Sequence, residues 1–177
     1  MQIPFVMIFV LFITSCSSFA AISDRTSDPF VATGSDFPSF VGVMPEDLVA
    51  FRFDDTWTQV PVQVDERDLI NFTNVYNGNK TYGNLIRLDY TDEGTFTGPD
   101  SDPSLDSNDE IVWMLKDMGV QRAETVTAPE GVIAGTGIEV TALDSTDDAG
   151  AYLYLFVQDG SLDQSAGVQY VQYDFVL

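Results

Sequence analysis

The sequence contains no histidine, and this absence limits the chemistry that the chain can perform. Catalytic triads and cysteine–histidine pairs need an imidazole base, and the usual zinc sites include histidine ligands. A glycine-rich loop of the kind that cradles phosphate is also missing. Among common enzyme mechanisms, glycoside hydrolysis by paired carboxylates stays open, with Asp65, Glu66 or Glu110 as candidates.

Cysteine occurs once in the 177 residues, at Cys16, so the chain cannot form an internal disulfide. Cys16 also lies in an N-terminal segment that we expect to be processed. An exported domain without a disulfide must be held together by its hydrophobic core or by bound metal. The scarcity of cysteine therefore favours a metal-stabilised domain.

Positive charge is scarce as well. Seven lysines and arginines face 28 aspartates and glutamates, which gives a net charge of −21 and an isoelectric point near 4.1. Nucleic acids and anionic membrane surfaces are poor partners for such a chain. A salty or calcium-rich medium suits it better, because screening and cation binding relieve the self-repulsion.

The longest apolar run is short. Residues 5–14 form a stretch of ten mostly apolar residues, whereas a membrane-spanning helix needs about 20. Small residues follow it, which predicts a signal peptide over 1–20 with cleavage after Ala20. Alternatively, Ile13-Thr-Ser-Cys16 resembles a bacterial lipobox, in which Cys16 would carry a lipid anchor. Either alternative places the mature protein outside the cell or on its surface.

The remainder of the chain predicts a β-rich domain. Residues 21–38 are polar and turn-rich and indicate a linker or an extended N-terminal arm, followed by one domain over 39–177. The sequence ends within a strand pattern, which is typical of the front of a longer protein. In the domain we expect an all-β fold, an antiparallel β-sandwich of about seven or eight strands. The expected strands span 48–53, 57–64, 85–90, 111–115, 137–142, 151–157 and 168–177.

Two expected strands, 111–115 and 151–157, are apolar on both faces, which is typical of central strands. In 57–64 the valines alternate with polar residues. Pro61 interrupts this run and cannot donate a backbone hydrogen bond, so we expect an edge strand or a bulge there.

Between the strands at 85–90 and 111–115 lies a dense run of short carboxylates. Calcium takes six to eight oxygen ligands, and a flexible loop with aspartates at short spacings can wrap around such an ion. No lysine or arginine lies between Arg87 and Lys116 to neutralise the acids. The alternative is a solvated acidic turn. The candidate calcium ligands are Asp100, Asp102, Asp106, Asn108, Asp109 and Glu110.

The spacing of Asp100, Asp102, Asp106 and Asp109 resembles part of the calcium repeats of thrombospondin type 3 and a degenerate EF-hand loop. The resemblance covers about ten residues and implies calcium binding. It departs from both patterns, because Pro103 and Leu105 stand where glycine is usual and Ile111 stands where an EF-hand carries glutamate.

The charged stretch 65–68 follows the valine-rich strand. It suggests an acid–base pair, further ligands for the calcium site, or a charged turn in which Arg67 pairs with a neighbouring acid. Together, 60–68 and 106–114 resemble stretches near the start of large secreted β-rich proteins without assigned activity.

Three functions remain open. The first is a calcium-stabilised structural or adhesion module without catalytic activity, which would bind an extracellular protein or polysaccharide. The second is a carbohydrate-binding module that uses the aromatic residues Trp57, Tyr76 and Tyr82. The third is a fragment of a carboxylate-based glycosidase.

Overall fold

The computed structural model describes residues 27–74, 84–91, 93–143 and 150–163. The expected signal peptide, Cys16 and the expected strand at 168–177 lie outside these residues, as do Tyr76 and Tyr82. Within the described ranges, no helix has the length and apolar character needed to cross a membrane. The strands found there are β1 (Pro29–Thr33), β2 (Leu48–Asp54), β3 (Thr56–Val60), β4 (Gln63–Asp65), β5 (Arg67–Asn71), β6 (Ile86–Tyr90), β7 (Glu110–Met114), β8 (Ile138–Leu143) and β9 (Gly150–Val157).

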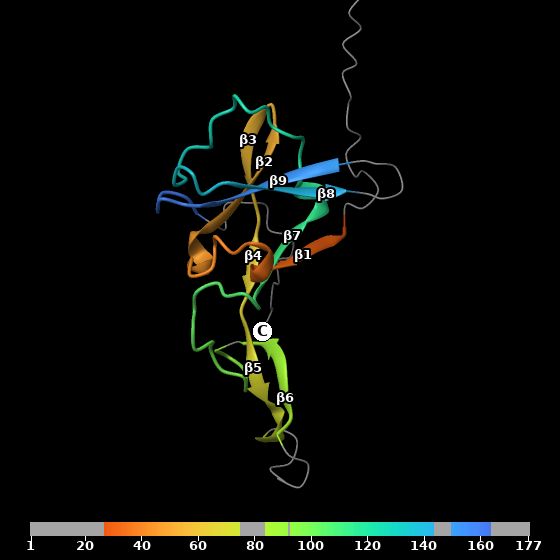
Figure 1. Ribbon diagram of the computed structural model, residues 1–177, viewed down its shortest axis with the longest axis vertical. Helices are drawn as coiled ribbons and strands as arrows, with labels where there is room; N and C mark the ends of the chain where they lie inside the picture. The colour runs from red at the N-terminus through yellow and green to blue at the C-terminus, as the bar shows by residue number, and fades with distance from the viewer. Residues whose placement is uncertain (1–26, 75–83, 92, 144–149, 164–177) are drawn as a thin grey trace, which may run out of the picture.

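The strands form three antiparallel sheets, so the predicted all-β fold is confirmed. The first sheet has the strand order β1-β7-β4, the second β3-β2-β9-β8, and the third is the hairpin β5-β6. Figure 1 shows this hairpin extending away from the other two sheets at one end of the molecule. Short 3₁₀ helices join the strands: η1 (Gly34–Asp36), η2 (Pro45–Asp47), η3 (Phe72–Asn74) and η5 (Leu115–Asp117).

The first two sheets pack their apolar faces together and form a sandwich. From the first sheet, β7 contributes Ile111 and Trp113, which are almost completely buried. From the second sheet, β9 contributes Leu153 and Leu155 to the same cluster. Burial of each such side chain is worth about 1.5–3 kcal/mol, so this cluster is the main stabilising core.

The opposite face of the second sheet is also covered. Tyr152, Tyr154 and Phe156 alternate with the core leucines along β9 and form a second buried cluster with residues of β2. Val132 and Leu162, from loops on this side, pack over it. Both faces of β9 are therefore buried, which explains its two-sided apolar sequence.

The predicted central strands are confirmed by the pairing. β7 lies between β1 and β4, and β9 lies between β2 and β8. The expected strand 57–64 is divided at Pro61. β3 ends at Val60 in one sheet, and β4 begins at Gln63 in the other. Both are edge strands, and Pro61, which cannot donate a backbone hydrogen bond, lies in the connection between them.

The segment 29–38 differs from the expected linker or arm. Residues 29–33 form β1, which pairs with β7 from Pro29↔Met114 to Thr33↔Glu110. Phe30 stacks on Trp113 with ring centroids 4.7 Å apart, and Phe37 is buried in the core cluster. The folded domain therefore includes residues from 29 onward, because these aromatic side chains bury more apolar surface than the polar composition of the segment indicated.

Candidate functional site

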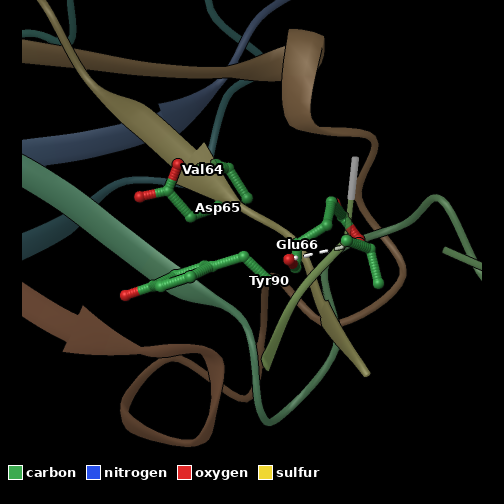
Figure 2. Close-up of a pocket in the computed structure, with 5 residues that line it drawn as sticks. Val64, Asp65, Glu66 and Tyr90 are labelled. Carbon is green, nitrogen blue, oxygen red and sulfur yellow. Dashed lines mark hydrogen bonds between the residues drawn. The ribbon is translucent and has the colours of Figure 1, made fainter. Parts of the chain in front are cut away.

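A single residue, Glu66, connects the sandwich to the projecting hairpin. It stands between the end of β4 at Asp65 and the start of β5 at Arg67. Its carbonyl oxygen accepts hydrogen bonds from the backbone N–H of Thr91, at 3.0 Å, and from the hydroxyl of Thr91, at 3.2 Å (Figure 2). These bonds close the base of the hairpin at Glu66.

The acidic loop approaches this connection because its middle is anchored in the core. Leu105 is 1% exposed and belongs to the main hydrophobic cluster. Its N–H donates to the carbonyl oxygen of Val43 at 2.9 Å, and its own carbonyl accepts from the N–H of Gly42 at 2.8 Å. A leucine at the position where calcium loops usually carry glycine therefore serves as the anchor of this loop.

Gly34 fixes the second half of the loop. Its N–H donates to the carbonyl oxygen of Asp109 at 2.9 Å, and the next residue, Ser35, donates to the carbonyl of Ser107 at 3.0 Å. A Cβ atom on Gly34 would lie only 1.8 Å from the carbonyl oxygen of Asp106. Only glycine permits this close approach of the two backbones.

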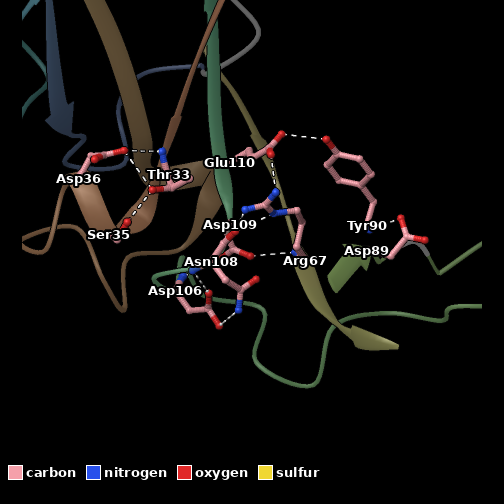
Figure 3. A network of polar contacts seen from close by, with 10 residues as sticks. All are labelled: Thr33, Ser35, Asp36, Arg67, Asp89, Tyr90, Asp106, Asn108, Asp109 and Glu110. Carbon is pink, nitrogen blue, oxygen red and sulfur yellow. Dashed lines mark hydrogen bonds and ion pairs between the residues drawn. The ribbon is translucent and has the colours of Figure 1, made fainter. Parts of the chain in front are cut away.

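Asp109 is the most deeply buried acid in the described part of the chain, with no exposed surface. One carboxylate oxygen accepts the backbone N–H of Arg67 at 2.8 Å, and the other accepts that of Asp106 at 2.6 Å (Figure 3). Burial raises the pKa of Asp109, and these two hydrogen bonds partly offset the shift. Asp109 thus holds the loop against the start of β5.

Three carboxylates converge at this point: Glu66, Asp100 and Asp109. Each offers an oxygen atom, and these atoms all lie within 4.8 Å of one another. Two oxygens bound to one calcium ion at about 2.4 Å lie at most about 4.8 Å apart, so the three carboxylates are close enough together to share one ion. The members come from the β4–β5 connection and from both ends of the acidic loop.

The carboxylate of Glu66 has no partner in the described part of the chain. Both of its oxygens are shielded from solvent, and neither accepts a hydrogen bond there. Burial, followed by repulsion from Asp109 and Asp100, raises the pKa of Glu66 to about 7. A buried carboxylate without a partner is costly, and a bound cation would remove that cost.

Arg67, the next residue, does not neutralise this cluster with its side chain. Its guanidinium donates to the carbonyl oxygen of Asn108, at 2.6 Å from Nε, and forms an ion pair with Glu110 (Figure 3). Glu110 also accepts the hydroxyl of Tyr90 at 2.8 Å. The positive charge of Arg67 is therefore shared with Glu110, although the backbone N–H of Arg67 supports Asp109.

The predicted ligands are distributed unevenly. Asp100 and Asp109 lie in the cluster, whereas Asp102 is exposed and accepts hydrogen bonds from the hydroxyl of Ser104 at 2.7 Å and from its N–H at 3.3 Å. Asp106 accepts the backbone N–H of Asn108 at 2.8 Å and its side-chain amide at 3.1 Å.

Asn108 and Glu110 differ in how their side chains are engaged. The side-chain oxygen of Asn108 is buried and lacks a hydrogen-bond partner among the described residues. Glu110 is occupied by Arg67 and Tyr90. The structure thus brings Glu66 next to two acids of the loop. A ligand role for the stretch 65–68, one of three uses that the sequence left open, stays a prediction.

A pocket of about 400 Å³ opens beside the cluster (Figure 2). Val64, Asp65, Glu66, Tyr90 and Thr91 line it. Tyr90 is half exposed, and no motif in the sequence marks it as a functional residue. The sequence could not identify Tyr90 as a pocket residue, because a tyrosine at the end of a strand is common and only the fold brings it next to Asp65.

Trp57, a candidate for sugar stacking, instead packs against the second buried cluster, formed by residues of β2 and β9. Its ring packs edge-on against Phe53, Tyr154 and Phe156, with centroids 5.0 to 6.0 Å apart. Its indole N–H donates to the carbonyl oxygen of Thr127 at 2.7 Å. Trp57 therefore stabilises the covered face of the sheet.

The candidate glycosidase carboxylates are poorly arranged for hydrolysis. A retaining or inverting pair must face the sugar from an open cleft. Of the three candidates, Glu66 has both carboxylate oxygens shielded from solvent and Glu110 is held by Arg67, which leaves Asp65 at the pocket.

No family model, curated protein or solved structure matches this chain. The function is therefore inferred from the geometry and charge of the cluster formed by Glu66, Asp100 and Asp109.

Proposed function

We propose that this chain is an exported structural or adhesion module that is stabilised by calcium, with Glu66, Asp100 and Asp109 as ligands of the ion. The observation that carries the proposal is the buried carboxylate of Glu66, which accepts no hydrogen bond from any described residue and lies against two further acids. Carboxylate oxygens are the ligands that calcium prefers, and backbone carbonyls or water would complete its coordination.

The position of the cluster suggests what the ion does. Glu66 belongs to the connection to the hairpin, and Asp100 and Asp109 belong to the loop. An ion bound to all three would fasten the hairpin to the sandwich. In a chain that cannot form an internal disulfide, such a cross-link supports the role of an extracellular module that binds a protein or polysaccharide.

The test is the melting temperature of the purified protein in calcium, in magnesium and in excess chelator. Calcium at about 100 times its dissociation constant stabilises the folded state by about 2.7 kcal/mol, which raises the melting temperature by several degrees. Magnesium should act weakly, because it requires a smaller, near-octahedral arrangement of ligands. Isothermal titration should give one site per chain.

Matched variants identify the ligands. Glu66→Gln and Asp100→Asn keep the shape of each side chain and should abolish the calcium effect. Glu124→Gln removes one exposed charge elsewhere and should leave the effect intact. An equal response to calcium and magnesium in all variants would contradict a specific site, because it would mean that the cations only screen the charge of the acids. Asp102→Asn distinguishes the ligands proposed here from the ligands expected from the loop spacing, because only the second set includes Asp102. Loss of calcium binding in this variant would therefore favour the second set.

The pocket favours a second candidate function, the binding of a carbohydrate. Tyr90 lines it with a half-exposed side chain, and Asp65 places a hydrogen-bonding carboxylate on the same pocket. Calorimetry with soluble polysaccharides would test this candidate. Binding that survives in Tyr90→Phe but is lost in Tyr90→Ala would support it, whereas equal binding by both variants would contradict it.

A further inference from the structure

The outer edge of the hairpin is unpaired in the described part of the chain. β6 has β5 on one side, and no strand adjoins its other side. Hydrogen bonds from Thr91 to Glu66 and from Phe72 to Leu85 mark the residue pairs that bond directly across the hairpin. Because such pairs alternate along an antiparallel ladder, Arg87 and Asp89 also direct their backbone groups toward β5.

The three other residues of β6 direct their backbone groups outward. Ile86, Leu88 and Tyr90 therefore present N–H and C=O groups along an open edge. All three side chains are between 43% and 51% exposed. Leu69 of β5, which lies opposite Leu88, is 65% exposed. The hairpin thus combines a free edge with an uncovered apolar face. Two-stranded hairpins of this kind are marginally stable alone.

The sequence of β6 is complementary to itself. When a second copy is placed antiparallel with Leu88 opposite Leu88, each Arg87 lies opposite Asp89 of the other copy, and each Ile86 lies opposite Tyr90. This register also matches the backbone phase, since the outward-facing residues of one strand meet the outward-facing residues of the other. A register centred on Arg87 or Asp89 would place like charges opposite each other. It would also set backbone groups that point toward β5 at the centre of the contact.

The charge distribution also favours a second copy of this chain as the partner of β6. The chain carries a net charge of −21, which opposes self-association over most of the surface. The strands of the hairpin carry two arginines and two aspartates and are neutral overall. The edge of β6 is therefore a place where two copies can approach, with opposite charges meeting on both sides of the central Leu88 pair.

We propose that β6 pairs with β6 of a second copy of this chain across a two-fold axis, which forms a four-stranded sheet. The apolar faces of the two hairpins then join into one continuous face that includes Leu69 and Leu88 from each copy. In the single chain, the guanidinium of Arg87 bonds the carbonyl of Ile86 at 2.8 Å, and Asp89 accepts the N–H of Tyr90 at 2.9 Å. Pairing replaces these exposed bonds with backbone bonds and ion pairs between copies.

Sedimentation equilibrium of the purified protein at near-physiological salt tests the proposal. The protein should form a dimer in the micromolar range. Arg87→Asp or Asp89→Arg alone places like charges opposite each other twice and should weaken the dimer by about tenfold or more. The chain carrying both substitutions restores opposite charges and should dimerise again. Glu124→Arg, an exposed charge reversal outside the hairpin, should leave the dimer unchanged.

Mixing the two single variants gives the sharpest result. One chain then carries two acids at these positions and the other carries two arginines, so the mixture should form a heterodimer that is tighter than the weakened homodimer of either variant. Circular dichroism of each variant checks that it is folded. A wild-type protein that stays monomeric, a dimer that is insensitive to either reversal, or a mixture that fails to associate would overturn the proposal.

Discussion

Replacing Glu66 with glutamine should change the stability of the protein in opposite directions with and without calcium. The pKa of Glu66 is raised from 4.5 to about 7, first by burial and then by repulsion from Asp109 and Asp100. The folded state therefore binds the proton of this group more tightly than the unfolded state does. The stability of the calcium-free protein falls as the pH rises from about 4.5 through about 7.

The size of the effect follows from the shift. The pKa rises from 4.5 to about 7, and at about 1.4 kcal/mol per unit the upper bound on the effect is about 3 kcal/mol. Solvent screening of this partly exposed residue lowers the value, and we expect about 1–2 kcal/mol. At pH 8 in chelator, Glu66→Gln should therefore raise the melting temperature by roughly 3–8 °C. At pH 5 the effect should be small, because Glu66 is already protonated in the folded state.

The assay is thermal unfolding of the wild type and Glu66→Gln at pH 5 and pH 8, each in calcium and in chelator. The variant should be the more stable protein in chelator at pH 8 and the less stable one in saturating calcium. The comparison isolates Glu66 from other acids with raised pKa values, such as Asp109 and Asp117. A glutamine variant that is less stable in chelator at pH 8 would refute the reasoning, since it would mean that the charge of Glu66 is already compensated.

Three further changes test other parts of the structure. Leu105→Ala removes the buried anchor of the acidic loop and should lower the free energy of unfolding by about 2–4 kcal/mol, measured by urea titration. Gly34→Ala places a Cβ against the backbone of Asp106 and should weaken calcium binding together with stability, whereas an unchanged calorimetric titration would contradict this role. Calcium affinity in the wild type should fall about tenfold from pH 8 to pH 6, because the ion competes with the proton on Glu66. A flat pH profile would exclude Glu66 as a ligand.

The strands that the sequence predicts well are those whose local pattern matches their burial. In β9, large aromatics alternate with leucines, and both sets are buried, so the pattern identifies a central strand without any knowledge of its neighbours. β5 was not predicted, because Arg67 and Asp68 at its start have the composition of a charged turn. Its pairing with β6 depends on backbone bonds that polar residues make equally well.

The cluster of Glu66, Asp100 and Asp109 was predictable only in part, for a similar reason. The density of acids between 100 and 110 is visible in the sequence and points to a cation. The participation of Glu66 depends on the pairing of β4 with β7, which sets Asp65 opposite Glu110 and brings the next residue to Asp109. That register is a property of the folded sandwich, and no spacing within residues 60–68 reveals it.

The connection between β4 and β5 also limits how sequences with this fold can vary in length. Because one residue joins the two strands, an insertion of a single residue there would rotate the following strand by one position and exchange the two faces of the hairpin. Leu69 and Asp68 would trade sides, and the carboxylate of Glu66 would leave the cluster. Natural variants should therefore keep the length of this connection, whereas the long loop between η5 and β8 can gain or lose residues at lower cost.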